Sequence, residues 1–292
     1  MAATTRGGVF PIVEIFGYPV DASSGSAVKS RRLRHCPFAE TPCEKYRQYG
    51  FGYCSVTYAA EDDGGERQTY AVCDHRLDGE PLQVAIRDHF GSRSANVHLV
   101  PEIVLTNPRT SFDFAAFTVS DGEIDDLVII ETQAIDIRGG GVGPAWRAWE
   151  AGEVVRWREY FTKESAAKGR RDTVAYGVNM ANIYKRLGMQ VAVKGSYLKS
   201  IGIPFYVAMQ DRPFQYLRRR IAFEDAVNDW DITFVTFDYS GATMSDGRLG
   251  FSQRQIVRST LSNYVTALTS NARLGADERA NFLRIIKRKA GL

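Results

Sequence analysis

The chain has 292 residues, of which 44% are hydrophobic and 24% charged, a composition typical of a folded globular protein. Its formal net charge of +3 allows contact with nucleic acid without requiring it. No apolar run approaches the ~20 residues that cross a bilayer, and the N-terminal residues lack a long apolar signal segment. We therefore expect no membrane partner and a cytoplasmic location, where thiols stay reduced.

Residues 1–80 are rich in Gly, Pro and short strand-like segments, and we expect an irregular module without a large core. All the cysteines lie in this module: Cys36, Cys43, Cys54 and Cys73. Their spacing differs from the paired CxxC pattern of common zinc sites. Four thiols in a core-poor module nevertheless favour a tetrahedral S₄ site, which selects zinc or iron. Two alternatives are four separate buried thiols, and a site in which His35 or His75 replaces one cysteine.

Helices and strands are expected to be mixed in the rest of the chain. Hydrophobic periodicity predicts helices over residues 81–91, from Pro144 onward, and over about 173–200, 251–271 and 276–291. Strands are predicted over residues 111–119, 126–135, 203–210 and 230–239. The dipeptide Asp121-Gly122 between the first two strands is a hairpin signal. This order indicates a mixed α/β domain over residues 81–292, with a central sheet flanked by helices.

Two acidic residues interrupt the apolar strands of the expected hairpin. A hairpin centred on Gly122 places Asp113 opposite Glu131, and Gln133 shares a face with Glu131 because strand side chains alternate. Two buried carboxylates are costly unless a cation neutralises them, and oxygen ligands of this kind suit Mg²⁺. Such an ion can lower the pKa of a bound water and stabilise charge on a phosphate under attack. The alternative is that Asp113 lies at a strand edge and Glu131 forms an ordinary salt bridge.

The helix expected near residue 190 carries two further polar groups. Gln190 and Lys194 lie one turn apart on the face that also carries Ile183 and Leu187. Polar groups on an inward face need a partner, and in this architecture they can reach a scissile phosphate. The alternative is a lysine that extends its ammonium to solvent at the helix edge.

These motifs together resemble one family of nucleases. The segments that carry the resemblance are "PIVEIFGYPV", "CPF", "GYCSV", "YAVCDHRLDGEP", "SFDF", "IIETQAID" and "NIYKRLGMQVAVKG". In this order they are similar to the NotI-type type II restriction endonucleases of the PD-(D/E)xK superfamily, over about residues 10–210. Gln133 stands where the superfamily motif usually has lysine, so the carboxamide would position the attacking water without taking its proton.

The resemblance implies a PD-(D/E)xK nuclease core preceded by a Cys₄ module that serves structure and DNA recognition. It implies a homodimer that uses Mg²⁺ to cut both strands of double-stranded DNA at a palindromic, GC-rich site, leaving 5′-phosphates. A cognate DNA methyltransferase is then expected in the same restriction-modification system. By resemblance, Asp113, Glu131 and Gln133 are assigned to catalysis, assisted by Gln190 and Lys194. The four cysteines would hold one iron atom, with zinc as the fallback.

Basic clusters are the candidates for contact with the DNA backbone, which provides most of the affinity for duplex DNA. The residues that we assign to this role are Lys29, Arg31, Arg32, Arg34, Lys168, Arg170 and Arg171. A third cluster is Arg218–Arg220, and each cluster has the alternative of being a solvated face. Two alternative functions remain open: a metal-stabilised DNA-binding protein without cleavage activity, and a structure-specific repair nuclease.

Overall fold

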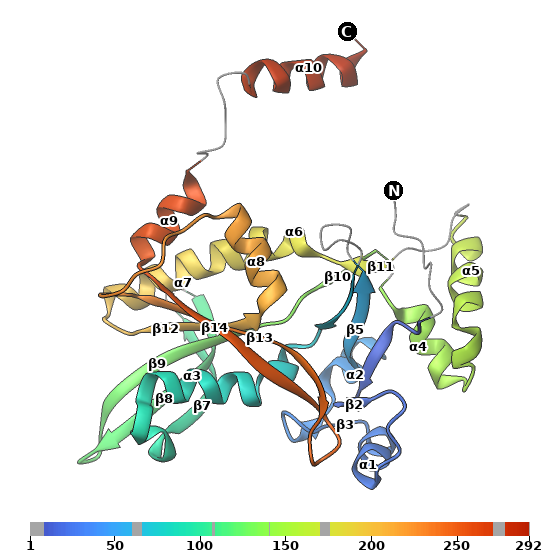
Figure 1. Ribbon diagram of the computed structural model, residues 1–292, viewed down its shortest axis with the longest axis horizontal. Coiled ribbons are helices and arrows are strands. Elements are labelled where there is room, and N and C mark those ends of the chain that lie inside the picture. The colour runs from blue at the N-terminus through green and yellow to red at the C-terminus, as the bar shows by residue number, and fades with distance from the viewer. Residues whose placement is uncertain are drawn as a thin grey trace.

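The computed structural model describes residues 9–59, 66–106, 109–139, 141–169, 176–270 and 278–291. Its largest element is a mixed six-stranded sheet in the order β14-β13-β12-β9-β8-β7 (Figure 1). The strands are β7 (His98–Thr106), β8 (Arg109–Ser120), β9 (Glu123–Gln133), β12 (Phe205–Gln210), β13 (Ile232–Thr243) and β14 (Leu249–Ser259). Helices cover both faces, so the predicted α/β class with a central mixed sheet is confirmed.

The β8–β9 hairpin has the register that the sequence predicts near its acidic residues. Phe114 pairs with Ile130 and Phe117 with Leu127 in the antiparallel ladder. Asp121 and Gly122 both have positive φ, 53° and 84°, as a two-residue type I′ turn requires. A bulge next to Thr118 shifts the register only toward the turn. The hairpin therefore places Asp113 and Glu131 on neighbouring strands.

Strands β9, β12 and β13 run parallel to one another. All six residues of β12 are buried, as expected for a parallel strand that is covered on both faces. The connection from β9 to β12 passes through α6 (Met180–Asn182), the π-helical turn η5 (Ile183–Leu187) and α7 (Gly188–Ser200). This crossover brings α7 across the sheet beside β9, where the candidate site lies.

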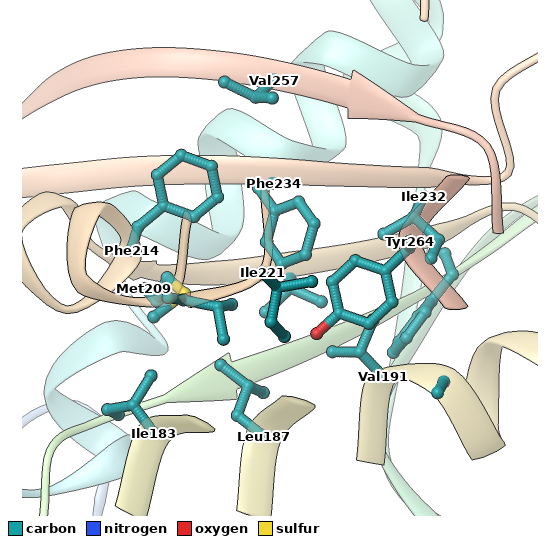
Figure 2. Packing of buried hydrophobic residues seen from close by; sticks show 14 of the residues in the cluster. Ile183, Leu187, Val191, Met209, Phe214, Ile221, Ile232, Phe234, Val257 and Tyr264 are labelled. Atoms are coloured by element: carbon teal, nitrogen blue, oxygen red, sulfur yellow. The ribbon is translucent and has the colours of Figure 1, made fainter. Parts of the chain in front are cut away.

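One face of the sheet is covered by α6, η5, α7, α8 (Asp211–Arg220) and α9 (Leu261–Thr269). Figure 2 shows Leu187 and Val191 packed beneath Phe234 and Tyr264 in this core. The opposite face is covered by α3 (Glu80–Phe90), whose apolar residues pack against Val128. Since the neighbouring Ile129 belongs to the first core, the pleat of β9 separates the two layers.

The N-terminal residues form a four-stranded antiparallel sheet in the order β2-β1-β5-β6. Its strands are β1 (Ile12–Ile15), β2 (Tyr18–Pro19), β5 (Tyr53–Ala59) and β6 (Arg67–Ala71). Around it lie α1 (Gly25–Leu33), the short strands β3 (His35–Cys36) and β4 (Thr41–Pro42), α2 (Glu44–Tyr49) and the 3₁₀ turn η2 (Asp74–Leu77). This part of the chain is more regular than the irregular module that its Gly and Pro content predicts.

The core of the N-terminal sheet is completed from outside residues 1–80. Helices α4 (Gly143–Glu150) and α5 (Trp157–Ala167), separated by the turn η4 (Val154–Arg156), bring Trp146 and Phe161 against Ile15 and Val56. Figure 1 shows both helices beside the N-terminal sheet and away from the large one. In the small antiparallel ladder that follows β9, strand β10 (Ile137–Gly139) precedes α4, and its partner β11 (Tyr176–Val178) lies between α5 and α6 in sequence.

A buried polar cluster ties the two sheets together. Glu14 in β1 is fully buried and accepts hydrogen bonds from Ser55 Oγ (2.7 Å), Arg76 Nε (3.0 Å) and Tyr239 Oη (2.7 Å). Tyr239 belongs to β13 of the large sheet, whereas the other three residues belong to the N-terminal part. The carboxylate of Glu14 is therefore compensated by a guanidinium and two hydroxyl groups, as a buried charge requires.

Three expectations about secondary structure need correction or addition. The helix predicted over about residues 173–200 begins only at Met180, because residues 176–178 form strand β11. Residues 251–259 form strand β14, which pairs antiparallel with β13, and only residues from Leu261 onward form the predicted helix. Strand β7 was not predicted, because Pro101 interrupts its apolar pattern. The predicted helices α3 and α10 (Glu278–Ala290) are confirmed, and η3 (Gly91–Asn96) follows α3. In the described part of the chain, no helix is both long and apolar enough to span a membrane.

Candidate active site

A cleft of about 870 Å³ lies between the N-terminal part and the large sheet. All five residues that the sequence assigns to catalysis line it: Asp113, Glu131, Gln133, Gln190 and Lys194. The N-terminal part contributes Phe38, Asp74, His75 and Asp78 to the opposite wall. The cleft therefore combines side chains from β8, β9, α7 and η2, which are far apart in the sequence.

Asp113 and Glu131 interlock through the backbone of the two strands. Thr132 N donates to Asp113 Oδ2 (2.9 Å), and Asp113 N donates to Glu131 Oε1 (3.3 Å). Each carboxylate is thus fixed by an amide of the neighbouring strand and lines the same cleft. The expectation that they are neighbours agrees with this geometry.

Both carboxyl groups resist ionisation in the metal-free protein. Burial, followed by repulsion from Asp113, raises the pKa of Glu131 to about 7. Burial likewise raises the pKa of Asp113. A cation bound between them would oppose both effects, since it stabilises the ionised forms. Two carboxyl groups on adjacent strands provide the kind of oxygen donors that fit Mg²⁺.

Lys194 is the cation closest to the acidic pair. Its Nζ lies 2.5 Å from Glu131 Oε2, and both side chains are only 13% and 12% exposed. The ammonium also lies 5.5 Å from the centre of the Phe112 ring. The sequence placed Lys194 on the correct helix face but did not reveal its ion pair with Glu131. A lysine thus reaches the acidic pair from α7, whereas position 133 in β9 is a glutamine.

The two glutamines occupy different parts of the cleft. Gln133 is half-buried, and its Nε2 donates to Ala134 O (2.6 Å). Gln190 is exposed on the α7 wall, one turn from Lys194. Gln133 therefore lies beside the carboxylates, and Gln190 is available to a ligand in the cleft.

The turn η2 and its C-cap residue supply two acids that sequence reasoning did not single out. Asp74 Oδ1 accepts a hydrogen bond from Ala134 N (2.8 Å), directly beyond the Glu131–Gln133 segment. Asp78 Oδ2 lies 2.6 Å from His75 Nδ1, and its Oδ1 accepts from Thr132 Oγ1 (3.4 Å). The acids of "CDHRLD" immediately after Cys73 were the signal in the sequence. Both acids therefore contact the C-terminal end of β9 from the N-terminal part of the protein.

The four cysteines line one small cavity of about 10 Å³, which is room for a single water-sized occupant. His75 and Lys45 also line this cavity, whereas His35 does not. No disulfide links the cysteines. Among the described residues, however, no three His, Cys, Asp or Glu side chains are grouped so that they could hold an ion as they stand. The thiols surround a common space without forming a closed centre.

The cavity is chemically suited to a soft cation. Burial raises the pKa of all four thiols, most strongly for Cys54 and Cys73, the latter to about 12. Lys45 Nζ donates to Tyr53 O (3.1 Å) and Val72 O (2.8 Å) beside the sulfurs, and burial lowers the pKa of its ammonium group. Four soft sulfur donors around an atom-sized space fit iron or zinc bound as thiolates.

None of the described members of the predicted DNA-binding clusters lines the cleft. In the first cluster, Arg31 donates to Ala22 O (2.8 Å) and Pro19 O (2.5 Å), so its guanidinium fastens α1 to the β2 region. The other members of this cluster are exposed: Lys29, Arg32 and Arg34.

The second and third clusters are partly neutralised. Lys168 forms an ion pair with Glu164 (2.5 Å), and Arg170 and Arg171 lie outside the described residues. In the third cluster, Arg218 pairs with Asp225 (2.9 Å). Among the described members of the three clusters, the first cluster therefore has the most exposed basic side chains.

No protein-family model matches the chain, and comparison with curated proteins found no match. The chemistry of the site is therefore inferred from its own residues.

Proposed function

We propose that the protein is a Mg²⁺-dependent type II restriction endonuclease with a PD-(D/E)xK-type active site. The observation that carries this proposal is the convergence of Asp113, Glu131 and Lys194 in one cleft, from two adjacent strands and a crossing helix. A paired acidic site with a nearby lysine suits phosphodiester hydrolysis, in which charge develops on the phosphate oxygens.

Each residue of the site has a distinct proposed task. Asp113 and Glu131 hold Mg²⁺, which supplies Lewis-acid stabilisation and a more acidic water when bound. Lys194 lies against Glu131 and places positive charge where a scissile phosphate would gain negative charge. Gln133 orients the attacking water through its carboxamide and cannot accept its proton. Gln190 contacts the phosphate from the α7 wall.

We propose a structural role for the cysteine cavity. Cys36, Cys43, Cys54 and Cys73 would hold one iron ion, or zinc as the fallback, and so stabilise the N-terminal part. Metal analysis of the purified protein tests this assignment, and Cys54→Ser is the matched variant. Stoichiometric iron or zinc in the wild type and its loss in the variant support the site. Wild-type protein that contains no metal, and whose thermal midpoint does not change when iron or zinc is added, would contradict this assignment.

The DNA partner and the assembly follow from the same proposal. A two-fold homodimer would match a two-fold palindromic duplex, with one cleft at each strand. The exposed basic residues of α1 would contact phosphates beside the N-terminal part. A DNA methyltransferase of the same specificity would protect the host DNA, and the products would carry 5′-phosphates.

Plasmid digestion with end-mapping tests the proposed function. We expect discrete fragments with Mg²⁺ and none with EDTA. Asp113→Asn and Glu131→Gln should abolish cleavage, whereas Glu123→Gln, at the exposed far end of the same strand, should cleave normally. Retarded but intact DNA would instead identify a binding protein without nuclease activity. Cleavage that follows DNA shape without a fixed sequence would identify a repair nuclease.

A further inference from the structure

A second cavity, of about 410 Å³, lies on the N-terminal part and shares no lining residue with the catalytic cleft. We call it the Trp–Arg pocket. Its lining residues come from the β1–β2 turn, α1 and its C-cap, α2 and α4: Phe16, Arg31, Arg34, Tyr46, Trp146, Trp149 and Glu150. Its volume lies within the range of small-molecule sites.

Aromatic rings form much of its wall. The ring centre of Trp146 lies 4.9 Å from that of Trp149 and 6.1 Å from that of Tyr46. Trp146 is buried, whereas Trp149 and Tyr46 are half-buried and so leave ring surface accessible. Accessible aromatic faces of this kind bind planar ligands by stacking.

Positive charge and unused donors accompany these rings. The Arg34 guanidinium lies 4.2 Å from the centre of the Tyr46 ring, and no carboxylate of the described residues pairs with it. Arg31 is fixed by two backbone carbonyls. Arg31 Nε and Trp146 Nε1 are buried without a hydrogen-bond partner among the described residues. Buried donors normally have acceptors, so these two N–H groups are available to an acceptor on a ligand.

The backbone around the pocket is held in a costly conformation. Phe16 has φ 48° at the first position of the β1–β2 turn, where Asn or Gly is usual. Its ring fills the space above Gly52, since a Cβ at that glycine would come within 2.2 Å of the ring. Phe16 lines both the cysteine cavity and the Trp–Arg pocket. Strain of this kind is typical of functional sites.

We propose that the Trp–Arg pocket binds a single nucleotide, with its base stacked on the ring of Trp149 and its phosphate on Arg34. Two guanidinium groups outnumber the one carboxylate, Glu150, which favours an anionic ligand. Glu150 can accept a hydrogen bond from an exocyclic amino group of the base. Resting on the proposed nuclease function, the nucleotide would be one turned out of the DNA duplex, at the energetic cost of unstacking.

Tryptophan fluorescence of the full-length protein, titrated without Mg²⁺, tests the pocket itself. We expect saturable quenching by deoxynucleoside monophosphates and at least about tenfold weaker binding of inorganic phosphate, because stacking is lost. Arg34→Ala and Trp149→Leu should each weaken nucleotide binding by about tenfold. Arg158→Ala, which removes an exposed arginine over the Trp157 ring outside the pocket, should have no effect.

Three results would overturn the nucleotide site: no saturable quenching, equal affinity for inorganic phosphate, or unchanged affinity in Arg34→Ala. Because Arg34 is exposed, this variant should keep the wild-type thermal midpoint, which separates lost binding from unfolding.

The source of the nucleotide is tested with DNA. A short duplex carrying one unpaired 2-aminopurine should bind several-fold more tightly than the fully paired duplex, and Arg34→Ala should remove the difference. Mononucleotide binding without this preference would overturn the DNA source and leave a free nucleotide as the ligand. Nucleotide binding by a protein that does not cut plasmid would refute the nuclease proposal alone. Cleavage without nucleotide binding would refute the pocket alone.

Discussion

At the residue scale, two neighbouring charges of opposite sign act on the pKa of Glu131. Burial, followed by repulsion from Asp113, raises its pKa, whereas the ammonium of Lys194 at 2.5 Å lowers it. Ionising both neighbouring carboxyl groups therefore costs folding stability, and a bound cation would lower that cost.

The first prediction concerns stability and pH in the absence of divalent cations. The pKa of Glu131 is raised from 4.5 to about 7, so its stabilising contribution is present at acidic pH and is lost as pH rises through about 7. Asp113→Asn removes one cause of that shift and can still accept the Thr132 N–H. We expect it to be more stable than wild type at pH 8 by on the order of 1 kcal/mol, or ~2–4 °C in thermal midpoint.

Thermal melts of both proteins from pH 5 to pH 8 check this expectation. The two midpoints should converge toward the acidic end. If the difference between the two thermal midpoints stays the same from pH 5 to pH 8, Asp113 does not raise the pKa of Glu131.

The second prediction concerns Lys194. Lys194→Met should reduce the cleavage rate by about 10²-fold or more, because it removes a preorganised positive charge beside the phosphate. Lys194→Arg should recover part of the rate. The control is Lys199→Met on the same helix, where the lysine is exposed and pairs with Asp231. Single-turnover rates at saturating Mg²⁺ measure the effect, and equal rates for Lys194→Met and the control would refute the role.

At the scale of elements, η2 connects the cysteine cavity with the cleft. Cys73 lines the cavity, and the next residue, Asp74, accepts the Ala134 N–H at the end of β9. The 3₁₀ turn η2, which lies outside the large sheet, therefore fixes the segment that carries Glu131 and Gln133.

The third prediction follows from that contact. Asp74→Ala leaves the Ala134 amide without its acceptor and should lower stability by about 1–3 kcal/mol. Cleavage should fall as well, whereas the metal content of the cysteine cavity should stay at the wild-type level. Glu80→Ala, an exposed change at the start of α3, is the control. Chemical denaturation, cleavage rates and metal analysis on the same samples provide the measurements. Loss of metal together with activity would show that η2 acts through the cavity.

Local signals explain which elements the sequence predicts correctly. Asp121-Gly122 specifies a tight turn, and this turn sets the register that brings Asp113 to Glu131. Helical periodicity likewise places Gln190 and Lys194 on one face of α7. No Gly or Pro separates residues 251–259 from the following helix, so no local signal marks the boundary between them. Their extended conformation depends on pairing with β13. The ion pair of Lys194 with Glu131 joins residues 63 positions apart, and no local pattern encodes it.

At the scale of the whole molecule, the cleft that contains the candidate site depends on contacts that hold the two sheets together. The Glu14 cluster fixes β1 to β13 through the Tyr239 hydroxyl, and Arg76 packs 4.2 Å from the ring centre of Phe251 in β14. Gln210 at the end of β12 also accepts from Ala71 N (2.6 Å) in β6. These contacts place the η2 acids opposite the β8–β9 hairpin.

The fourth prediction tests this connection. Tyr239→Phe removes a hydrogen bond to a buried carboxylate and should lower the unfolding free energy by about 1.5–3 kcal/mol. Tyr216→Phe, whose hydroxyl accepts from Arg220 on an exposed part of α8, should change it by less than about 0.5 kcal/mol. Urea denaturation followed by fluorescence measures both. Equal midpoints for the two variants would show that the Tyr239 contact does not stabilise the fold.

Calorimetric titration of Mg²⁺ into the Mg²⁺-free full-length protein most directly tests the claim that Asp113 and Glu131 jointly bind the ion. We predict saturable binding to the wild type and to Glu123→Gln, and its loss in both Asp113→Asn and Glu131→Gln. Wild-type Mg²⁺ affinity in both active-site variants would contradict the account.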